Sequence, residues 1–181
     1  VQMITVNFGS FKEYNMKNRF FNMNLAGGAL LDIGVYALSI VRSFMTEKPA
    51  DIVSQWKPSP AGSDEQAAIL LKNKDGQMAT VALSLHSKQP KRAMISCEKG
   101  YIEIMEYPRA DRAEIVDAST GEKKEISCGK TEDALFYEMT DIERAVESGD
   151  ETEMYLNYTK DVMDIMTGLR REWGLKYPEE M

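Results

Sequence analysis

Residues 27–44 read GGALLDIGVYALSIVRSF and form the most apolar stretch of the chain. Apolar side chains recur here at spacings of three and four, which predicts a helix over residues 27–45 with one buried face. The residues of that face are Leu30, Ile33, Ala37, Ile40, Val41 and Phe44. Asp32 nevertheless stands near the start of the helix, and Tyr36 follows it. Because a buried carboxylate without a partner is costly, Asp32 needs a hydrogen-bond partner or a pocket.

Two interpretations of Asp32 remain open at this point. The first is that its carboxylate caps the N-terminus of the helix, directly after a flexible pair of glycines. The second rests on Tyr36, which lies four residues on and therefore shares a helix face with Asp32 one turn away. Ser39 and Ser43 continue this polar stripe. A cap would explain the carboxylate but not the tyrosine.

The rest of the chain predicts a sheet followed by helices. Residues 1–8 alternate between apolar and polar, as in a half-buried strand. Residues 73–76, Asn-Lys-Asp-Gly, form a hairpin signal between two β-like runs. Further β-like runs lie at residues 51–57, 92–98, 101–105, 112–117 and 123–127. Strands that follow one another without intervening helices predict an α+β fold with an open, mainly antiparallel sheet and helices packed on one face.

One face of the second hairpin run is neither clearly apolar nor strongly charged. Its residues are Met78, Thr80, Ala82, Ser84 and His86. This mixture suits a subunit interface, although a solvated face fits the pattern about as well. The open face therefore predicts a homo-dimer or a higher oligomer.

Two helices are predicted after the last strand. The first has Thr131 as a candidate N-cap, Gly149 as its stop and one apolar stripe. That stripe consists of Leu135, Met139, Ile142 and Val146. The second helix runs from about residue 157 to residue 173 and is expected to face inward with Val162, Ile165, Met166 and Leu169.

Composition excludes several classes of partner. The 181 residues suit a single domain, and 29 acidic against 22 basic residues give a net charge of −7. This balance argues against nucleic acid or an anionic membrane as the main partner. The most apolar run is too short and carries too much charge to predict a membrane span. Cys97 and Cys128 lie far apart without metal-ligand spacing, so we expect free thiols in a reducing compartment and a cytoplasmic protein.

Motifs for metals and phosphates are weak. A single histidine, His86, makes a multi-histidine metal site impossible within this chain, and we expect no metal. Residues 128–131, CGKT, end like a phosphate-binding loop, but that motif requires glycine where Lys124 stands. No GxGxxG fingerprint for a dinucleotide occurs, so no cofactor-binding residues are predicted in this chain.

Residues 17–44, KNRFFNMNLAGGALLDIGVYALSIVRSF, resemble the central motif of the glucose–fructose oxidoreductase / inositol dehydrogenase (Gfo/Idh/MocA) family. The match is closest to its dihydrodiol dehydrogenase-like members. Residues 170–180, RREWGLKYPEE, are similar to the tail of those members, and residues 97–104, CEKGYIEI, resemble a strand turn of the family. The resemblance covers nearly the whole chain.

The resemblance implies a domain assignment. Residues 1–181 are expected to be a single C-terminal substrate-binding and oligomerisation domain of an NAD(P)-dependent oxidoreductase. The family's N-terminal Rossmann domain, which binds NAD or NADP, is missing from this chain, and the start within a strand agrees with that expectation. The chain alone is therefore expected to be inactive.

The resemblance also implies the site residues. Asp32 and Tyr36 correspond to the catalytic pair and contact substrate, and Arg19, in the loop before the motif, is a third candidate for substrate binding. The family's usual histidine is a tyrosine here, so the proton-transfer residue is either Tyr36 or the lysine of the missing domain. A free tyrosine ionises near pH ~10, and a tyrosine therefore acts as a base only beside a cation.

The resulting hypothesis is hydride transfer between a sugar-like or diol alcohol carbon and a nicotinamide cofactor. The alternative is a non-catalytic dimerisation or ligand-sensing domain of the same fold.

Overall fold

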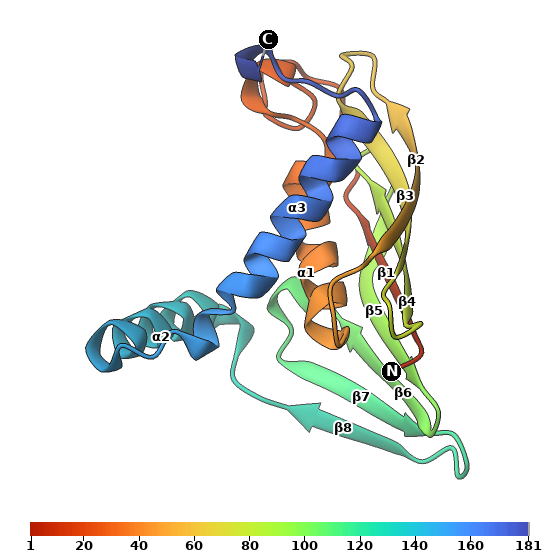
Figure 1. Ribbon diagram of the computed structural model, residues 1–181, viewed down its shortest axis with the longest axis vertical. Coiled ribbons are helices and arrows are strands. Elements are labelled where there is room, and N and C mark those ends of the chain that lie inside the picture. The colour runs from red at the N-terminus through yellow and green to blue at the C-terminus, as the bar shows by residue number, and fades with distance from the viewer. Residues whose placement is uncertain (181) are drawn as a thin grey trace.

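The computed structural model describes residues 1–180, apart from the side chain of residue 153, and shows a curved sheet with helices against one face (Figure 1). The strands are β1 (Met3–Gly9), β2 (Asp51–Pro58), β3 (Asp64–Lys72), β4 (Met78–Ser84), β5 (Gln89–Cys97), β6 (Gly100–Met105), β7 (Arg112–Asp117) and β8 (Lys123–Ser127). The helices are a π-helical turn (Leu30–Gly34), α1 (Val35–Phe44), α2 (Ala134–Ser148) and α3 (Leu156–Glu172). Short 3₁₀ turns lie at Met23–Leu25, Tyr107–Arg109, Thr131–Asp133, Thr152–Met154 and Pro178–Glu180.

The sheet has eight strands in the order β2-β3-β4-β1-β5-β6-β7-β8. β1 lies in the middle, parallel to β4 and antiparallel to β5, and the other pairings in the described part of the chain are antiparallel. The predicted hairpin joins β3 to β4, where the Gln77 N–H donates to the Asn73 side-chain oxygen over 2.9 Å. The predicted open, mainly antiparallel sheet is therefore confirmed.

The core lies between the sheet and the two helices α1 and α3. Alternate residues of β1, such as Ile4 and Val6, are buried against the helices, as the sequence pattern predicts. The inward face of α3 is also confirmed, since Val162, Ile165, Met166 and Leu169 are all buried.

The apolar stretch around α1 serves as the core helix of the fold. By length and composition alone, Met23–Phe44 is apolar enough to cross a membrane, with a hydropathy of 1.5. Half of this window is buried within the fold, between the sheet and α3. This burial favours the core helix that the sequence predicts, but the prediction that the run is too short and too charged to pass as a membrane span is wrong, because the helical segment extends back to Met23.

The environment of α2 differs from the prediction. Figure 1 shows α2 standing away from the sheet, and none of its described residues is buried. The predicted apolar stripe exists but is exposed, with exposed fractions from 40% to 79% for Leu135, Met139, Ile142 and Val146. Periodicity alone predicts which face of a helix is apolar but not whether the same chain covers it.

The ends of α2 are partly as predicted. Gly149 ends the helix in the left-handed conformation, with φ of 71°. The predicted cap at Thr131 is wrong, because Thr131 begins a 3₁₀ turn and its hydroxyl donates to the Arg109 carbonyl over 2.9 Å.

His86 also lies elsewhere than expected. β4 ends at Ser84, so the alternation of the strand does not extend to His86. The imidazole instead stacks on Tyr14, with 4.4 Å between ring centroids, and lies beside Phe11. His86 therefore belongs to an aromatic cluster rather than to the open face of the sheet.

The start of the core helix is held by Asp64, which is the first residue of β3. The Leu30 N–H donates to Asp64 Oδ2 over 2.6 Å, and the carboxylate is fully buried. Its other oxygen, Oδ1, has no hydrogen-bond partner among the described residues. A Cβ at Gly28 would lie 2.0 Å from this oxygen, so only glycine fits there.

Burial raises the pKa of Asp64 from 3.8 to about 7, although backbone N–H donors and Arg170 oppose the shift. A carboxyl group whose pKa is raised in the folded state stabilises the fold most when it is protonated. That contribution is complete below the unfolded pKa and is lost as the pH rises through the folded pKa, here between about pH 4 and about pH 7.

Asp64→Asn is expected to remove this pH dependence, because the amide stays neutral. The free energy of unfolding of the parent, relative to that of Asp64→Asn, should therefore fall between about pH 5 and about pH 8. Urea denaturation of both proteins at the two pH values measures the difference. Parallel changes in the two proteins would contradict the assignment.

Candidate active-site cleft

A cleft of about 450 Å³ opens where β1 ends and the core helix begins. It brings together the three site residues predicted from the sequence, Arg19, Asp32 and Tyr36. These residues come from the loop before the helix, the π-helical turn and the first turn of α1. The structure thus places all three in one cavity, and their roles in binding and chemistry stay predictions.

Asp32 points into the cleft and has a partner there. Its side chain is 12% exposed, and Arg19, whose side chain is 64% exposed, donates to Asp32 Oδ1 through Nη1. The helix start makes no side-chain cap bond of its own, and the capping carboxylate comes from Asp64. The interpretation of Asp32 as the helix cap is therefore wrong.

The backbone around Asp32 is a π-helical turn, Leu30–Gly34, before α1 continues in regular geometry. Such a turn contains one more residue than an α-helical turn and changes the direction in which side chains point. Single π-helical turns within α-helices are found frequently at functional sites. The sequence pattern gave no signal for it.

Tyr36 forms one wall of the cleft. Its ring packs against Phe8 of β1, with 6.2 Å between the centroids and 48° between the planes. Nearly half of the residue, 47%, is exposed. The phenol is therefore supported on one side and accessible on the other.

The cleft contains two cations that the sequence did not reveal, Lys12 and Lys91. Lys12 lies 4.4 Å from the centre of the Phe20 ring, and Lys91 binds Glu106 over 2.8 Å. Lys91 reaches the cleft only because β5 pairs with β1 across the sheet. No local pattern signals a contact between segments so far apart in sequence.

Together with Arg19, these lysines give the cleft three cationic side chains beside one carboxylate. This arrangement can bind and orient polar or anionic groups of a small molecule. Within residues 1–180, no group of three or more histidine, cysteine or acidic side chains is placed to hold a metal.

The chain is thus an α+β domain with an open sheet covered on one face and with a carboxylate and a phenol in a cleft at the start of the core helix. The GFO/IDH/MocA C-terminal domain profile matches residues 1–103. The chain belongs to the GFO/IDH/MocA family and contains this C-terminal domain.

Its relatives are dehydrogenases. The trans-1,2-dihydrobenzene-1,2-diol dehydrogenase of Danio rerio is 24% identical over 173 residues, covering 90% of this chain and 51% of the relative. The enzyme of the same name from Mus musculus is 31% identical over 87 residues, covering 48% of this chain and 26% of the relative. The chain thus spans at most about half the length of these curated relatives.

Solved structures share the fold. The 3-ketoreductase KijD10 of Actinomadura kijaniata, in complex with NADP and TDP-benzene, superposes with a TM-score of 0.76 at 14% identity, covering 94% of this chain and 53% of that one. The aldose-aldose oxidoreductase of Caulobacter crescentus gives 0.73 at 19% identity, with 94% and 53% covered. These likenesses confirm the fold class predicted from the sequence.

The different positions of Asp32 and Asp64 predict different stability effects. Asp64→Ala should lower the free energy of unfolding by ~1–3 kcal/mol, because it removes the cap and leaves the buried Leu30 N–H unpaired. Asp32→Asn should change it by less than ~1 kcal/mol, because its partner Arg19 is mostly exposed. Urea denaturation near neutral pH compares the two variants. An equal loss of unfolding free energy in both variants would indicate that Asp32 also caps the helix.

Proposed function

We propose that the chain is the substrate-binding and oligomerisation domain of an NAD(P)-dependent oxidoreductase that acts on a sugar-like or diol alcohol or the corresponding carbonyl. The observation that carries this proposal is the cleft in which Asp32 and Tyr36 lie side by side on the core helix, accessible from outside. Family membership and the dehydrogenase relatives support it. The exposed free thiols of Cys97 and Cys128 support a cytoplasmic location.

The residues of the cleft fit the nicotinamide end of a cofactor. Phe8, Ile33 and Tyr36 present aromatic and apolar surface next to the Asp32 carboxylate. A bound nicotinamide supplies a hydride acceptor or donor. The chain offers no glycine-rich fingerprint for the rest of a dinucleotide, so we assign that part to a nucleotide-binding domain outside these residues.

A bound nicotinamide would accept the hydride from the alcohol carbon, or return it to a carbonyl, while a base in the site would accept or return the hydroxyl proton. Asp32 accepts a hydrogen bond from a substrate hydroxyl and orients it, exchanging its contact with the exposed Arg19 head group. Tyr36 hydrogen-bonds the reacting oxygen, and the proton passes either through Tyr36 or through the lysine that the resemblance places in the nucleotide-binding domain. Positioned groups of this kind contribute about 10²- to 10⁴-fold to the rate.

The exposed apolar stripe of α2 is the surface through which we expect the chain to contact a second domain. An apolar helix face that its own chain leaves uncovered is typical of a surface that packs against another element. The Danio rerio relative is about twice as long as the segment that it shares with this chain. We propose that α2 packs through this stripe against the nucleotide-binding domain.

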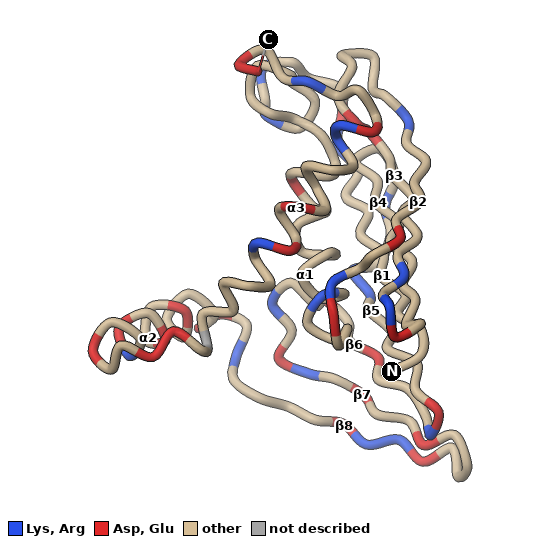
Figure 2. Tube along the Cα trace, in the orientation of Figure 1, with Lys and Arg blue, Asp and Glu red and all other residues tan. Residues whose placement is uncertain are grey.

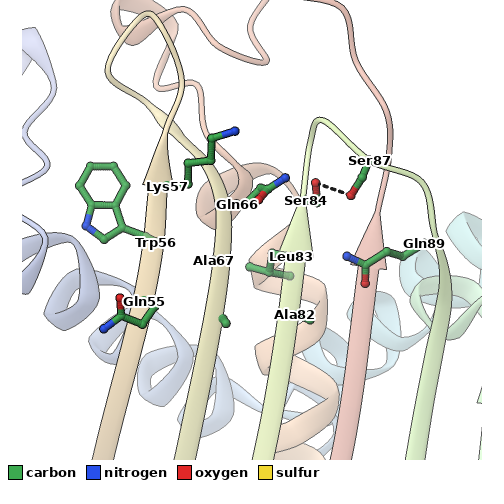
Figure 3. Close-up of a pocket in the computed structure, with 11 residues that line it drawn as sticks. Gln55, Trp56, Lys57, Gln66, Ala67, Ala82, Leu83, Ser84, Ser87 and Gln89 are labelled. Atoms are coloured by element: carbon green, nitrogen blue, oxygen red, sulfur yellow. Dashed lines mark hydrogen bonds between the residues drawn. The ribbon is translucent and has the colours of Figure 1, made fainter.

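The open face of the sheet is the proposed oligomer interface. Val53 and Leu70 are cross-strand partners there, 64% and 38% exposed, and Thr80 continues the row on β4. Beside them a shallow hollow of about 390 Å³ lies over the ends of β2, β3 and β4 (Figure 3). Gln55, Gln66 and Gln89 stand around it.

The charge pattern fits this division of surfaces. Figure 2 shows acidic residues concentrated along α2 and its flanks, whereas the row from Val53 to Thr80 is uncharged. Two copies of the sheet face can therefore meet without burying like charges in that row.

Asp32→Asn and Tyr36→Phe are expected to lower kcat/KM about 10²-fold or more, because each removes a group that contacts the reacting oxygen. The assay follows NAD(P)H absorbance in a polypeptide that carries this chain together with its nucleotide-binding domain. Tyr101→Phe, on the opposite face of the sheet, serves as the matched control and should keep the parental rate. Near-parental turnover in both site variants would overturn the roles of Asp32 and Tyr36, whereas a parent without turnover would favour the non-catalytic alternative.

Leu70→Arg is expected to dissociate the proposed oligomer, because it places an unpaired charge in the interface. Met163→Arg, which makes the same kind of change on the exposed side of α3, should leave the assembly intact. Sedimentation velocity of the three proteins over a range of concentrations measures this. A parent chain that remains monomeric at high concentration would argue against a dimer through the sheet.

A further inference from the structure

Three consecutive polar residues at the beginning of β3, Ser63, Asp64 and Glu65, are fully buried. Asp64 binds the start of the core helix, and the Ser63 hydroxyl donates to the Phe21 carbonyl over 3.1 Å. The third residue, Glu65, lies outside the cleft and has no part in the proposed reaction. A fully buried carboxylate is costly unless it is paired, so the contacts of Glu65 require an explanation.

Glu65 stands at a β-bulge next to the edge strand β2. Lys57 of β2 pairs with Gln66. The next residue, Pro58, pairs with Asp64, so Glu65 is the extra residue between the two pairs and has no partner on β2. Bulges are frequent at sheet edges and next to active sites. The bulge therefore marks Glu65 as a residue with a role beyond strand pairing.

Both oxygens of the Glu65 carboxylate have a partner. The Lys57 ammonium donates to Oε1 over 2.8 Å, and the Tyr14 hydroxyl donates to Oε2. Burial alone raises the pKa of Glu65, but the hydrogen bonds from Lys57 and Tyr14 outweigh burial and hold it below its ordinary value. Near neutral pH the group is therefore charged, and hydrogen bonds to a charged acceptor are stronger than those between neutral groups.

The hydrogen bond from Tyr14 holds the loop that runs from β1 to the core helix. The Tyr14 ring stacks on His86, with 4.4 Å between centroids, and its centroid lies 4.8 Å from that of Phe21. Two residues of the same loop, Lys12 and Arg19, line the cleft. Tyr14 lies between them in the sequence, so its position affects where both cations stand.

The backbone of Glu65 reaches the same loop through Leu85. The Leu85 N–H donates to the Glu65 carbonyl over 2.9 Å, and the Lys12 N–H donates to the Leu85 carbonyl over 2.8 Å. The backbone and the side chain of Glu65 therefore lead to two positions in the loop, Lys12 and Tyr14, that are two residues apart.

Lys57 connects these contacts to the open face of the sheet. Its side chain is 62% exposed, whereas that of Glu65 is 0% exposed. Figure 3 shows Lys57 and Gln66 at the shallow hollow over the ends of β2, β3 and β4. A continuous series of contacts therefore runs from the open face through Glu65 to the loop of the cleft.

We propose that Glu65 is a positioning residue of the cleft: its carboxylate, balanced by Lys57 on the open face, holds the loop that carries Lys12 and Arg19 into the cleft. The role of these two cations in binding substrate rests on the proposed function. The holding of the loop rests on the contacts of Glu65 alone.

The first test measures amide hydrogen exchange in the 181-residue chain. Tyr14→Phe removes the hydroxyl that binds Glu65 and keeps the ring that stacks on His86. Exchange within residues 10–21 should become at least about tenfold faster, because a hydrogen bond to a charged group is lost. Exchange in α3 should stay at the parental rate, which shows that the core is intact.

Lys57→Met should release the same loop, because it leaves the buried carboxylate of Glu65 without its cation. Lys72→Met is the matched control, since Lys72 is an exposed lysine at the other end of β3. It should leave exchange in residues 10–21 at the parental rate.

The second test measures kinetics in the polypeptide that carries this chain together with its nucleotide-binding domain. Tyr14→Phe should raise KM about tenfold and leave kcat within about twofold, because it displaces groups that bind substrate. Loss of folded protein alone would lower kcat and leave KM unchanged. In a background of Lys12→Met and Arg19→Gln, Tyr14→Phe should have no further effect on KM.

Unchanged exchange in the loop of Tyr14→Phe, or an equal rise in α3, would overturn the holding of the loop by Glu65. A released loop with an unchanged KM would overturn the positioning role and leave the roles of Asp32 and Tyr36 intact. A parent without turnover would instead count against the proposed function, and hydrogen exchange would still decide whether Glu65 holds the loop.

Discussion

The hydrogen bond between the buried Asp64 carboxylate and the Leu30 N–H is the contact on which the site depends. It ties the first turn of the core helix to the start of β3, and Gly28, in the loop before the helix, packs against the same carboxylate. A helix start normally needs a capping side chain from nearby sequence. Because Asp64 provides the cap from 34 residues away, the carboxylate within the helix, Asp32, is left for the cleft.

The separate roles of the two carboxylates, Asp64 as the helix cap and Asp32 as a residue of the cleft, explain why an apolar helix carries a charge. One carboxylate is buried, holds the backbone and has a raised pKa. The other lies at the edge of the cleft and pairs with the exposed Arg19. The helix can then bury its apolar side against the sheet and α3 while one polar edge, from Asp32 through Tyr36 to Ser43, lines two adjoining cavities.

Much of the fold follows from local pattern. The alternation in β1, the turn after Asn73 and the inward face of α3 each depend on neighbours within a few residues, and the structure confirms all three. The motif around Asp32 and Tyr36 also carried enough information to identify the family and to group the two residues in one cleft.

The features that the sequence pattern did not predict depend on contacts between segments that are far apart in the sequence. The capping role of Asp64 and the position of Lys91 depend on pairings that join strands far apart in the sequence. The stripe on α2 was identified correctly as apolar, but its exposure depends on how the chain beyond β8 turns away from the sheet. Tyr155, just before α3, has a left-handed backbone with φ of 50°. The sequence does not signal this conformation, because left-handed positions are anticipated only where glycine or asparagine stands.

The central claim is that the Asp32–Tyr36 edge of the core helix faces the reacting end of a nicotinamide cofactor. A crystal structure of this chain together with its nucleotide-binding domain, with NADP bound, tests the claim most directly. We predict that the nicotinamide ring lies at the mouth of the cleft, with the Asp32 carboxylate and the Tyr36 hydroxyl on the side open to substrate. A nicotinamide held elsewhere, with Asp32 and Tyr36 turned away from it, would contradict the account.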